Sequence, residues 1–249
     1  MSLTIQQLEA QLPDATQLLS DEPEMESSLH FLQLLVLVTC LEWFWRDQED
    51  FFIGANLTIY FSRQQLRNRD FRGPDFFLVK PAAKRPRNSW VVWEEDGKYP
   101  NLIIELLSST TANIDRTLKK ELYQNHFRTP EYFWFSPDTL EFEGFRLSGQ
   151  QYQAIVPNAE GWRWSEVLEL YVGVSEGQLR YFAPTGIKVP TPEEAAAQAQ
   201  QAQQQAQQQA QQAQQRVEQI ESRLRQEEVR AARLAARLQA LGIDPEQDI

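Results

Sequence analysis

Residues 101–123 read NLIIELLSSTTANIDRTLKKELY, and this stretch decides the fold of the chain. Residues 102–107 form an apolar run that only Glu105 interrupts, which is typical of a strand buried on both faces. A Ser/Thr cluster ends the strand, Asn113 can cap a helix, and apolar residues then recur at helical spacing. A strand is therefore predicted to run directly into a helix. A carboxylate buried in such a strand needs a cation or strong donors, so Glu105 is a candidate functional residue.

The predicted helix carries Asp115, Lys119 and Tyr123 at intervals of four residues. Side chains four residues apart share one face of a helix, so this face has an acid, a base and a phenol. The alternative for Asp115 and Lys119 is an ordinary surface ion pair, which contributes only tenths of a kcal/mol.

Asp75 follows a Gly-Pro turn and precedes a short apolar strand, FFLV, at residues 76–79. Considered alone, Asp75 is typical of an acidic residue in a turn. A further short strand at residues 90–93 and a hairpin-like turn then lead into the strand of Glu105, so Asp75 and Glu105 are expected on neighbouring strands of one sheet. Two converging carboxylates suit a hard divalent cation such as Mg²⁺, which takes oxygen ligands and keeps several waters.

The remaining pattern predicts an α/β (α+β) fold in which helices flank a mixed central sheet. Glu26 and His30 lie four residues apart at the start of the first predicted helix. Such groups usually complement the helix dipole at the surface, and participation in a site is the alternative. The expected elements are a helix at 25–47, a strand at 52–61 with a Gly-Ala-Asn irregularity, an antiparallel meander at 130–135, 140–147 and 152–156, and two short strands at 171–174 and 179–182.

A net charge of −11 argues against a general affinity for nucleic acid or anionic membranes. Residues 63–87 are the exception, because they hold eight basic residues and only two acids. This segment is either a solvated loop or a surface that contacts phosphates. The candidate nucleic-acid contacts in it are Arg63, Arg67, Arg69, Arg72, Lys84, Arg85 and Arg87.

The composition predicts a cytoplasmic protein without a membrane segment. One cysteine and two histidines exclude a disulfide framework and a structural zinc site. The N-terminus lacks the basic and apolar regions of a signal peptide. The most apolar segment, residues 31–45, is shorter than the roughly 20 residues that a membrane span needs, so it is expected to be a core helix.

The chain divides into an N-terminal extension at 1–24, a globular domain at 25–190, a helix at 191–242 and a tail at 243–249. Residues 195–215 consist only of Ala and Gln, which favour helix but cannot supply a large core. Apolar residues at intervals of four and three run from Ala195 to Leu241 and favour a coiled coil that joins at least two copies. A single solvated helix and a partly disordered Gln-rich tail are the alternatives.

Three segments, PDFFLV, IIELLSSTTANIDRTLKKELY and TPEYFWFSPD, occur in an order and spacing that resemble the PD-(D/E)XK nuclease superfamily over residues 25–182. The resemblance is specifically to the Uma-type restriction endonuclease family. It implies a restriction-endonuclease-like core in which Asp75 and Glu105 bind Mg²⁺ (or Mn²⁺) and DNA phosphodiester bonds are hydrolysed. The superfamily lysine normally lies two residues after the second acid, where this chain has Leu107. In the Uma-type family a lysine on the next helix takes over this role, and Lys119 fits that pattern.

The resemblance also implies supporting roles. Asp115 would fix Lys119 by an ion pair, Tyr123 would position it, and Glu26 or His30 would reach the metal side. A homodimer is the natural unit for a double-strand cut, by analogy with the superfamily. Two other functions stay open: an inactive nuclease-fold protein that acts in interaction or regulation, and a nuclease for RNA or for DNA intermediates of mobile elements.

Overall fold

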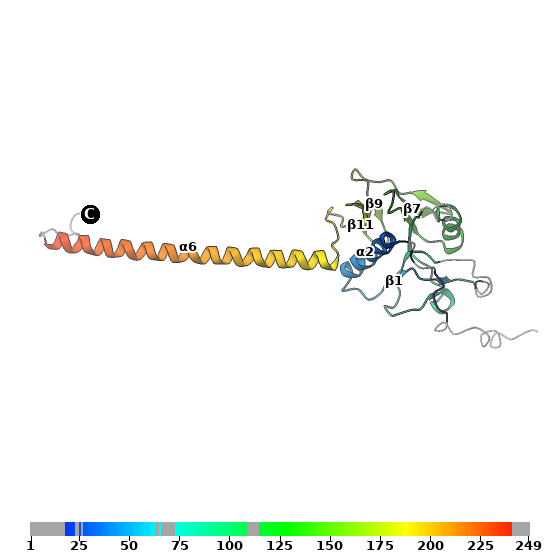
Figure 1. The fold of residues 1–249 in the computed structure, drawn as a ribbon, viewed down its shortest axis with the longest axis horizontal. Helices are drawn as coiled ribbons and strands as arrows, with labels where there is room; N and C mark the ends of the chain where they lie inside the picture. The colour runs from blue at the N-terminus through cyan, green and yellow to red at the C-terminus, as the bar shows by residue number, and fades with distance from the viewer. Residues whose placement is uncertain are drawn as a thin grey trace, which may run out of the picture. The chain divides into compact units, whose positions relative to one another are not determined.

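The computed structural model describes residues 18–22, 25, 27–62, 65, 73–108 and 115–240. Contacts divide the chain into two compact units, Met1–Pro192 and Glu193–Ile249. The first unit is a mixed α and β domain and the second is built on one long helix (Figure 1). In the described part of the chain, none of the helices combines the length and the apolar character that crossing a bilayer requires.

A six-stranded mixed sheet organises the first unit. Strands β5 and β6 run parallel, and every other neighbouring pair is antiparallel. The parallel pair needs a crossover, which the helical segment after β5 supplies, as the sequence predicted. In spatial order the strands are β1 (Phe52–Ala55), β3 (Phe76–Val79), β5 (Leu102–Leu106), β6 (Glu131–Phe135), β7 (Phe142–Ser148) and β8 (Gln151–Ala154).

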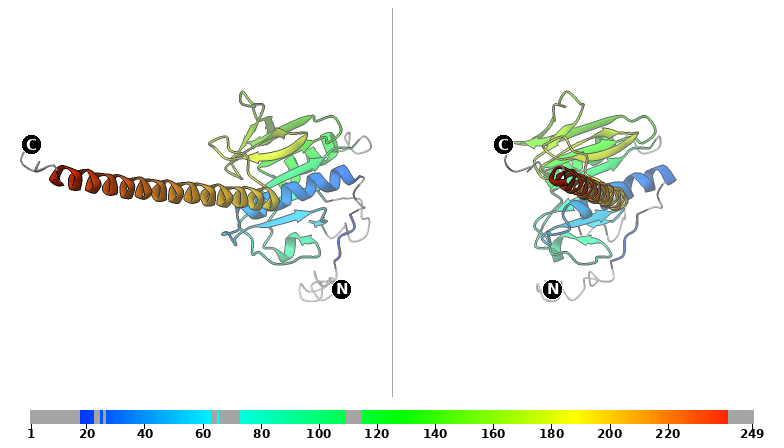
Figure 2. Two further views of the ribbon diagram at one scale, coloured as in Figure 1. Left: turned by 60° about the vertical axis from the view of Figure 1, so that its left-hand side comes forward. Right: turned by 90° about the vertical axis from the view of Figure 1, so that its left-hand side faces the viewer.

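Helix α2 (Ser28–Phe44) and a three-stranded antiparallel sheet cover one face of the large sheet. The Ser27 hydroxyl caps α2 by accepting from the backbone amide of His30. Helix α2, blue in Figures 1 and 2, contacts β11 as well as β1 and β3. The small sheet has the order β11 (Gln178–Phe182), β10 (Leu170–Ser175) and β9 (Arg163–Ser165), so the two short strands predicted near the end of the domain form a separate layer.

The opposite face is covered by the helical segment that follows β5. This segment consists of η3 (Asp115–Lys119) and η4 (Tyr123–Phe127), two π-helical turns, with α5 (Lys120–Leu122) between them. Tyr123 and Phe127 pack here with Ile103, Leu107 and Trp134 from the sheet. The short strands β2 (Ile59–Tyr60) and β4 (Trp90–Val91) pair in parallel, and η2 (Val92–Glu94) follows β4.

The predicted strand at 52–61 is wrong as one element, because β1 and β2 belong to different sheets. Asn56 adopts a positive φ of 46° and its amide donates to the carbonyl of Asp75 at 2.7 Å. Asparagine tolerates this left-handed conformation better than most residues, so the chain turns here instead of extending. The turn brings the backbone that precedes β2 against the start of β3.

Helix α6 (Pro192–Ala240) is uninterrupted and confirms the predicted C-terminal helix (Figure 1). None of its residues is buried in the single chain. Its large apolar residues are exposed, from 36% at Leu238 to 66% at Ile220. Whether they pack against a second copy stays a prediction, and Leu241 lies outside the described residues.

Candidate active site

Glu105 is completely buried and faces the helix that follows its strand. Along β5, Leu102, Ile104 and Leu106 enter the core on the α2 side. Strand side chains alternate between faces, so Glu105 points to the other side. There the Tyr123 hydroxyl donates to its Oε1 at 2.7 Å and the Lys119 ammonium donates to its Oε2 at 3.0 Å. Because a buried carboxylate is costly without a cation and donors, this arrangement accounts for an acid in the middle of the sheet.

Asp75 lies immediately before β3, the antiparallel neighbour of β5. The backbone amide of Leu106 donates to its Oδ2 at 2.7 Å. Its own backbone amide points to Oε2 of Glu105 at 3.4 Å. The strand pairing therefore brings the two predicted carboxylates together at one place on the sheet, and the roles assigned to them stay predictions.

Lys119 reaches Glu105 from the helical segment after β5. The strand position two residues after Glu105 holds Leu107, which is part of the core. Leu107 lies on the same side of the sheet as Glu105, but its side chain is buried among Phe127 and Trp134. A lysine at 107 would bury an ammonium in this apolar cluster. The π-helical turns on either side of α5 present both Lys119 and Tyr123 to one carboxylate. Such turns occur frequently at functional sites.

His30 supports the end of β5, and in the described part of the chain its ring bonds to backbone and hydroxyl groups instead of to either carboxylate. Its Nε2 lies 3.3 Å from the carbonyl oxygen of Leu107, and its Nδ1 lies 2.8 Å from the Ser27 hydroxyl. A carbonyl can only accept, so this pair requires the proton on Nε2 and makes Nδ1 the acceptor. His30 thereby ties the start of α2 to the backbone two residues beyond Glu105.

Glu22 was not predicted, yet it holds the turn that leads to Asp75. Its Oε1 accepts from the Thr58 hydroxyl at 2.7 Å and from the backbone amide of Gly73. A Cβ at position 73 would lie 2.3 Å from the carbonyl oxygen of Leu57, so only glycine fits beside this backbone. Burial raises the pKa of Glu22, the bonds from Gly73 and Thr58 and the charge of Lys119 oppose the rise, and the charge of Asp75 adds to it.

Replacing Glu22 by alanine should lower the free energy of unfolding by about 1–3 kcal/mol, because Thr58 and Gly73 then lose their acceptor. Glu22→Gln retains a carbonyl oxygen at the same place and should cost less than about 1 kcal/mol. Urea unfolding of the two variants checks this. Equal losses in both would show that the charge, and not the acceptor, stabilises the turn.

Several predicted residues fall on parts that the structure leaves undescribed. Glu26 and the side chain of Asp115 are among them, so their proposed supporting roles stay predictions. The same holds for four of the candidate nucleic-acid contacts, Arg63, Arg67, Arg69 and Arg72.

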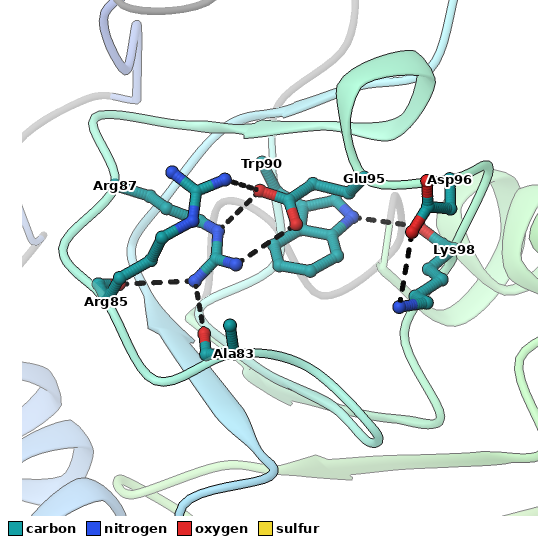
Figure 3. Close-up of polar contacts among 7 residues, drawn as sticks. All are labelled: Ala83, Arg85, Arg87, Trp90, Glu95, Asp96 and Lys98. Carbon is teal, nitrogen blue, oxygen red and sulfur yellow. Dashed lines mark hydrogen bonds and ion pairs between the residues drawn. The ribbon is translucent and has the colours of Figure 1, made fainter.

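The three candidate nucleic-acid contacts that the structure describes pair with carboxylates of the same chain. Lys84 pairs with Glu42, and Arg85 and Arg87 converge on Glu95 (Figure 3). Arg87 also lies over the ring of Trp90 and donates to the carbonyl of Ala83. Its side chain is only 3% exposed, whereas that of Arg85 is 56% exposed. Arg87 therefore anchors this loop, and Arg85 is the better placed of the two for a phosphate.

The donor set of Asp75 and Glu105 fits Mg²⁺ better than a transition metal. Within the described residues, three or more His, Cys, Asp or Glu side chains do not gather anywhere as a metal-binding group. Mg²⁺ is commonly held by one or two carboxylates together with waters and substrate phosphates, so it does not require such a group. The residues that would hold it are Asp75 and Glu105.

Comparisons with known proteins place this site in a family context. A search of curated proteins found no match. One solved structure, described as "a putative nuclease belonging to DUF820 from Anabaena variabilis ATCC 29413", is similar with 17% sequence identity and a TM-score of 0.40, over 55% of this chain and 75% of that chain. The Uma2 family model, described as "Putative restriction endonuclease", matches residues 7–181. This span contains every residue of the candidate active site and more than half of the chain, and the protein therefore belongs to the Uma2 family.

Proposed function

We propose that this protein is a Mg²⁺-dependent endonuclease that hydrolyses phosphodiester bonds of DNA. The observation that carries the proposal is the contact of Lys119 with Glu105 beside Asp75, on one face of the sheet. Membership of the Uma2 family supports a nuclease. The choice of Mg²⁺ rests on the chemistry of Asp75 and Glu105, and the choice of DNA rests on the family description "Putative restriction endonuclease".

Phosphodiester hydrolysis needs a nucleophilic water and compensation for the negative charge that grows on the phosphate. A bound Mg²⁺ would lower the pKa of a water and neutralise phosphate charge. Asp75 and Glu105 supply the anionic oxygens that would hold the ion, from two strands whose pairing fixes their separation. The pairing of β3 with β5 holds the backbone of both acids at one place before a substrate binds.

Lys119 supplies the positive charge that the chain itself brings to the site. Its side chain is 17% exposed, so it is partly dehydrated yet still accessible to a substrate. Charges act over longer range in such surroundings than in bulk water. Tyr123 holds the other oxygen of Glu105, which leaves Oε2 facing Lys119 and the amide of Asp75. The lysine would orient the attacking water or stabilise a phosphate oxygen.

The test is cleavage of supercoiled and linear DNA by purified protein with Mg²⁺, Mn²⁺ or EDTA. We expect nicked or cut product with either metal and none with EDTA. Asp75→Asn should abolish cleavage and should also remove the Mn²⁺ binding measured by calorimetry, because a neutral amide is a weaker ligand than a carboxylate. The matched control is Asp138→Asn, which changes an exposed acid in a turn.

Full cleavage by Asp75→Asn would contradict the proposal. A panel with RNA substrates separates a ribonuclease from a deoxyribonuclease.

The second candidate function is an inactive nuclease-fold protein that acts through interactions. It is favoured by the excess of 35 acidic over 24 basic residues, which opposes binding to a polyanion. Wild-type protein that binds no Mn²⁺ and cuts no substrate would support this second function.

A further inference from the structure

The C-terminal half of α6 presents an apolar stripe that nothing covers in the single chain. We call the stripe the seam, and it consists of Val217, Ile220, Leu224, Ala231, Leu234 and Leu238. The intervals between its members are three, four or seven residues, the spacing of positions a and d in a seven-residue repeat abcdefg. The seam side chains other than alanine are 36% to 66% exposed. A helix without a packed face gains little stability, so this spacing indicates a partner helix.

Charged residues flank the seam with opposite signs on its two sides. In this repeat Val217 is position a, so position g is an arginine four times in succession, at 216, 223, 230 and 237. Position e on the other side is Glu221 and then Glu228. A helix with one basic and one acidic border is complementary to a copy of itself in only one orientation.

We propose that α6 pairs with α6 of a second copy of this chain in a parallel, in-register coiled coil. In a parallel pair each g residue faces the following e residue of the other helix, so Arg216 meets Glu221 of the second copy and Arg223 meets Glu228 of the second copy. In an antiparallel pair g faces g and e faces e, which opposes arginine to arginine and glutamate to glutamate. Like charges at these positions disfavour a pairing, so the borders select the parallel orientation.

Contacts within the helix do not compete with this arrangement. Glu221 lies 3.4 Å from Arg225 and Glu227 lies 3.9 Å from Arg230, and all four side chains are more than half exposed. Exposed pairs of this kind contribute little. Glu227 occupies a d position, where two copies would face each other, and such a polar residue fixes register at a cost in stability.

The Ala/Gln half of α6 extends the pairing less strongly. Its seam positions are small alanines with one Gln209, and the intervals from 209 to 213 and from 213 to 217 are both four residues. Two successive intervals of four unwind a coiled coil locally. The pairing therefore depends on residues 216–240. Because the first unit of each copy precedes this helix, a parallel pair would have both nuclease domains at the same end of the coiled coil.

Single cysteine substitutions in the full chain test orientation and register. The natural Cys40 is completely buried, so it provides little background. We expect that Ile220→Cys and Leu234→Cys, made in separate proteins, each form a disulfide-linked dimer within minutes of mild oxidation. In an antiparallel pair a residue meets its own copy only where the twofold axis crosses the helices. Positions 220 and 234 are about 21 Å apart along the helix, so an antiparallel pair can link at most one of them. Ser222→Cys, on the opposite side of the helix, is the matched control: it should pair as wild type does but form no disulfide-linked dimer.

A charge exchange provides the second measurement, which does not depend on cysteine chemistry. Glu221→Arg/Glu228→Arg makes both borders basic and should raise the Kd of the dimer by about 10- to 100-fold in low salt, as measured by analytical ultracentrifugation. Adding Arg216→Glu/Arg223→Glu to the same chain should restore the Kd. A monomeric wild-type protein, or crosslinking at only one of the two seam positions, would overturn the proposal. These outcomes do not depend on whether the protein cleaves DNA.

Discussion

Replacement of Lys119 by methionine is expected to lower DNA cleavage by about 100- to 1,000-fold, the loss typical of removing one charge-stabilising group. It should also lower the free energy of unfolding by about 3 kcal/mol, because Glu105 is completely buried and loses the ammonium that pairs with it. Initial cleavage rates and urea unfolding of the same preparations measure the two effects. Methionine preserves most of the side-chain volume, so packing changes little.

The double variant Glu105→Gln/Lys119→Met separates catalysis from stability. It removes both charges, so most of the lost stability should return while cleavage stays absent. The matched control is Lys120→Met, since Lys120 neighbours Lys119 but lies over the ring of Phe145. Wild-type cleavage by Lys119→Met would exclude the helix lysine from the reaction.

Replacement of Glu131 by alanine is expected to destabilise the domain by about 3–5 kcal/mol. Glu131 is 1% exposed, and its Oε1 accepts from Arg146 and from the backbone amide of Glu166. Its Oε2 accepts from the buried hydroxyl of Ser165. This carboxylate joins β6 and β7 of the large sheet to β9 of the small one, and its loss leaves several donors unpaired at once.

Urea unfolding monitored by tryptophan fluorescence measures the effect. Glu166→Ala is the matched control, because Glu166 pairs with the same Arg146 but its side chain is 66% exposed. We expect that variant to lie within about 1 kcal/mol of wild type. A loss of similar size in the two variants would mean that the buried position of Glu131 adds no stability beyond that of an exposed ion pair.

The elements that the sequence predicted best are those whose patterns involve only residues close together in the chain. The apolar run around Glu105, the Gly-Pro turn before Asp75 and the helical spacing of Lys119 and Tyr123 each depend on a few adjacent residues. The pairing of β3 with β5 confirms the expectation that these strands are neighbours, across a connection that contains β4 and η2. The proximity of the acids and the lysine was therefore accessible from the sequence, together with the resemblance to a nuclease family.

What the sequence did not predict depends on contacts between distant residues. Glu22 lies in an acidic segment without periodicity, and its partner Gly73 is 51 positions away. Arg87 resembles any surface arginine in a basic loop until the fold places Glu95 and Trp90 beside it. Glu131 was visible as part of a motif, but its partner Ser165 lies on a strand of the other sheet. Tertiary packing decides such cases, and one chain's pattern does not encode which distant acid meets which base.

The position of Lys119 on the helical segment, and not on the strand of Glu105, has a consequence for evolution. The sheet supplies the acids and the helix supplies the ammonium, while Leu107 occupies the strand position as part of the core. A substitution on the helix that is accompanied by neutralisation of the acid would silence the chemistry and leave the scaffold folded. A descendant in which both charges change together would lose the proposed activity and keep a stable fold.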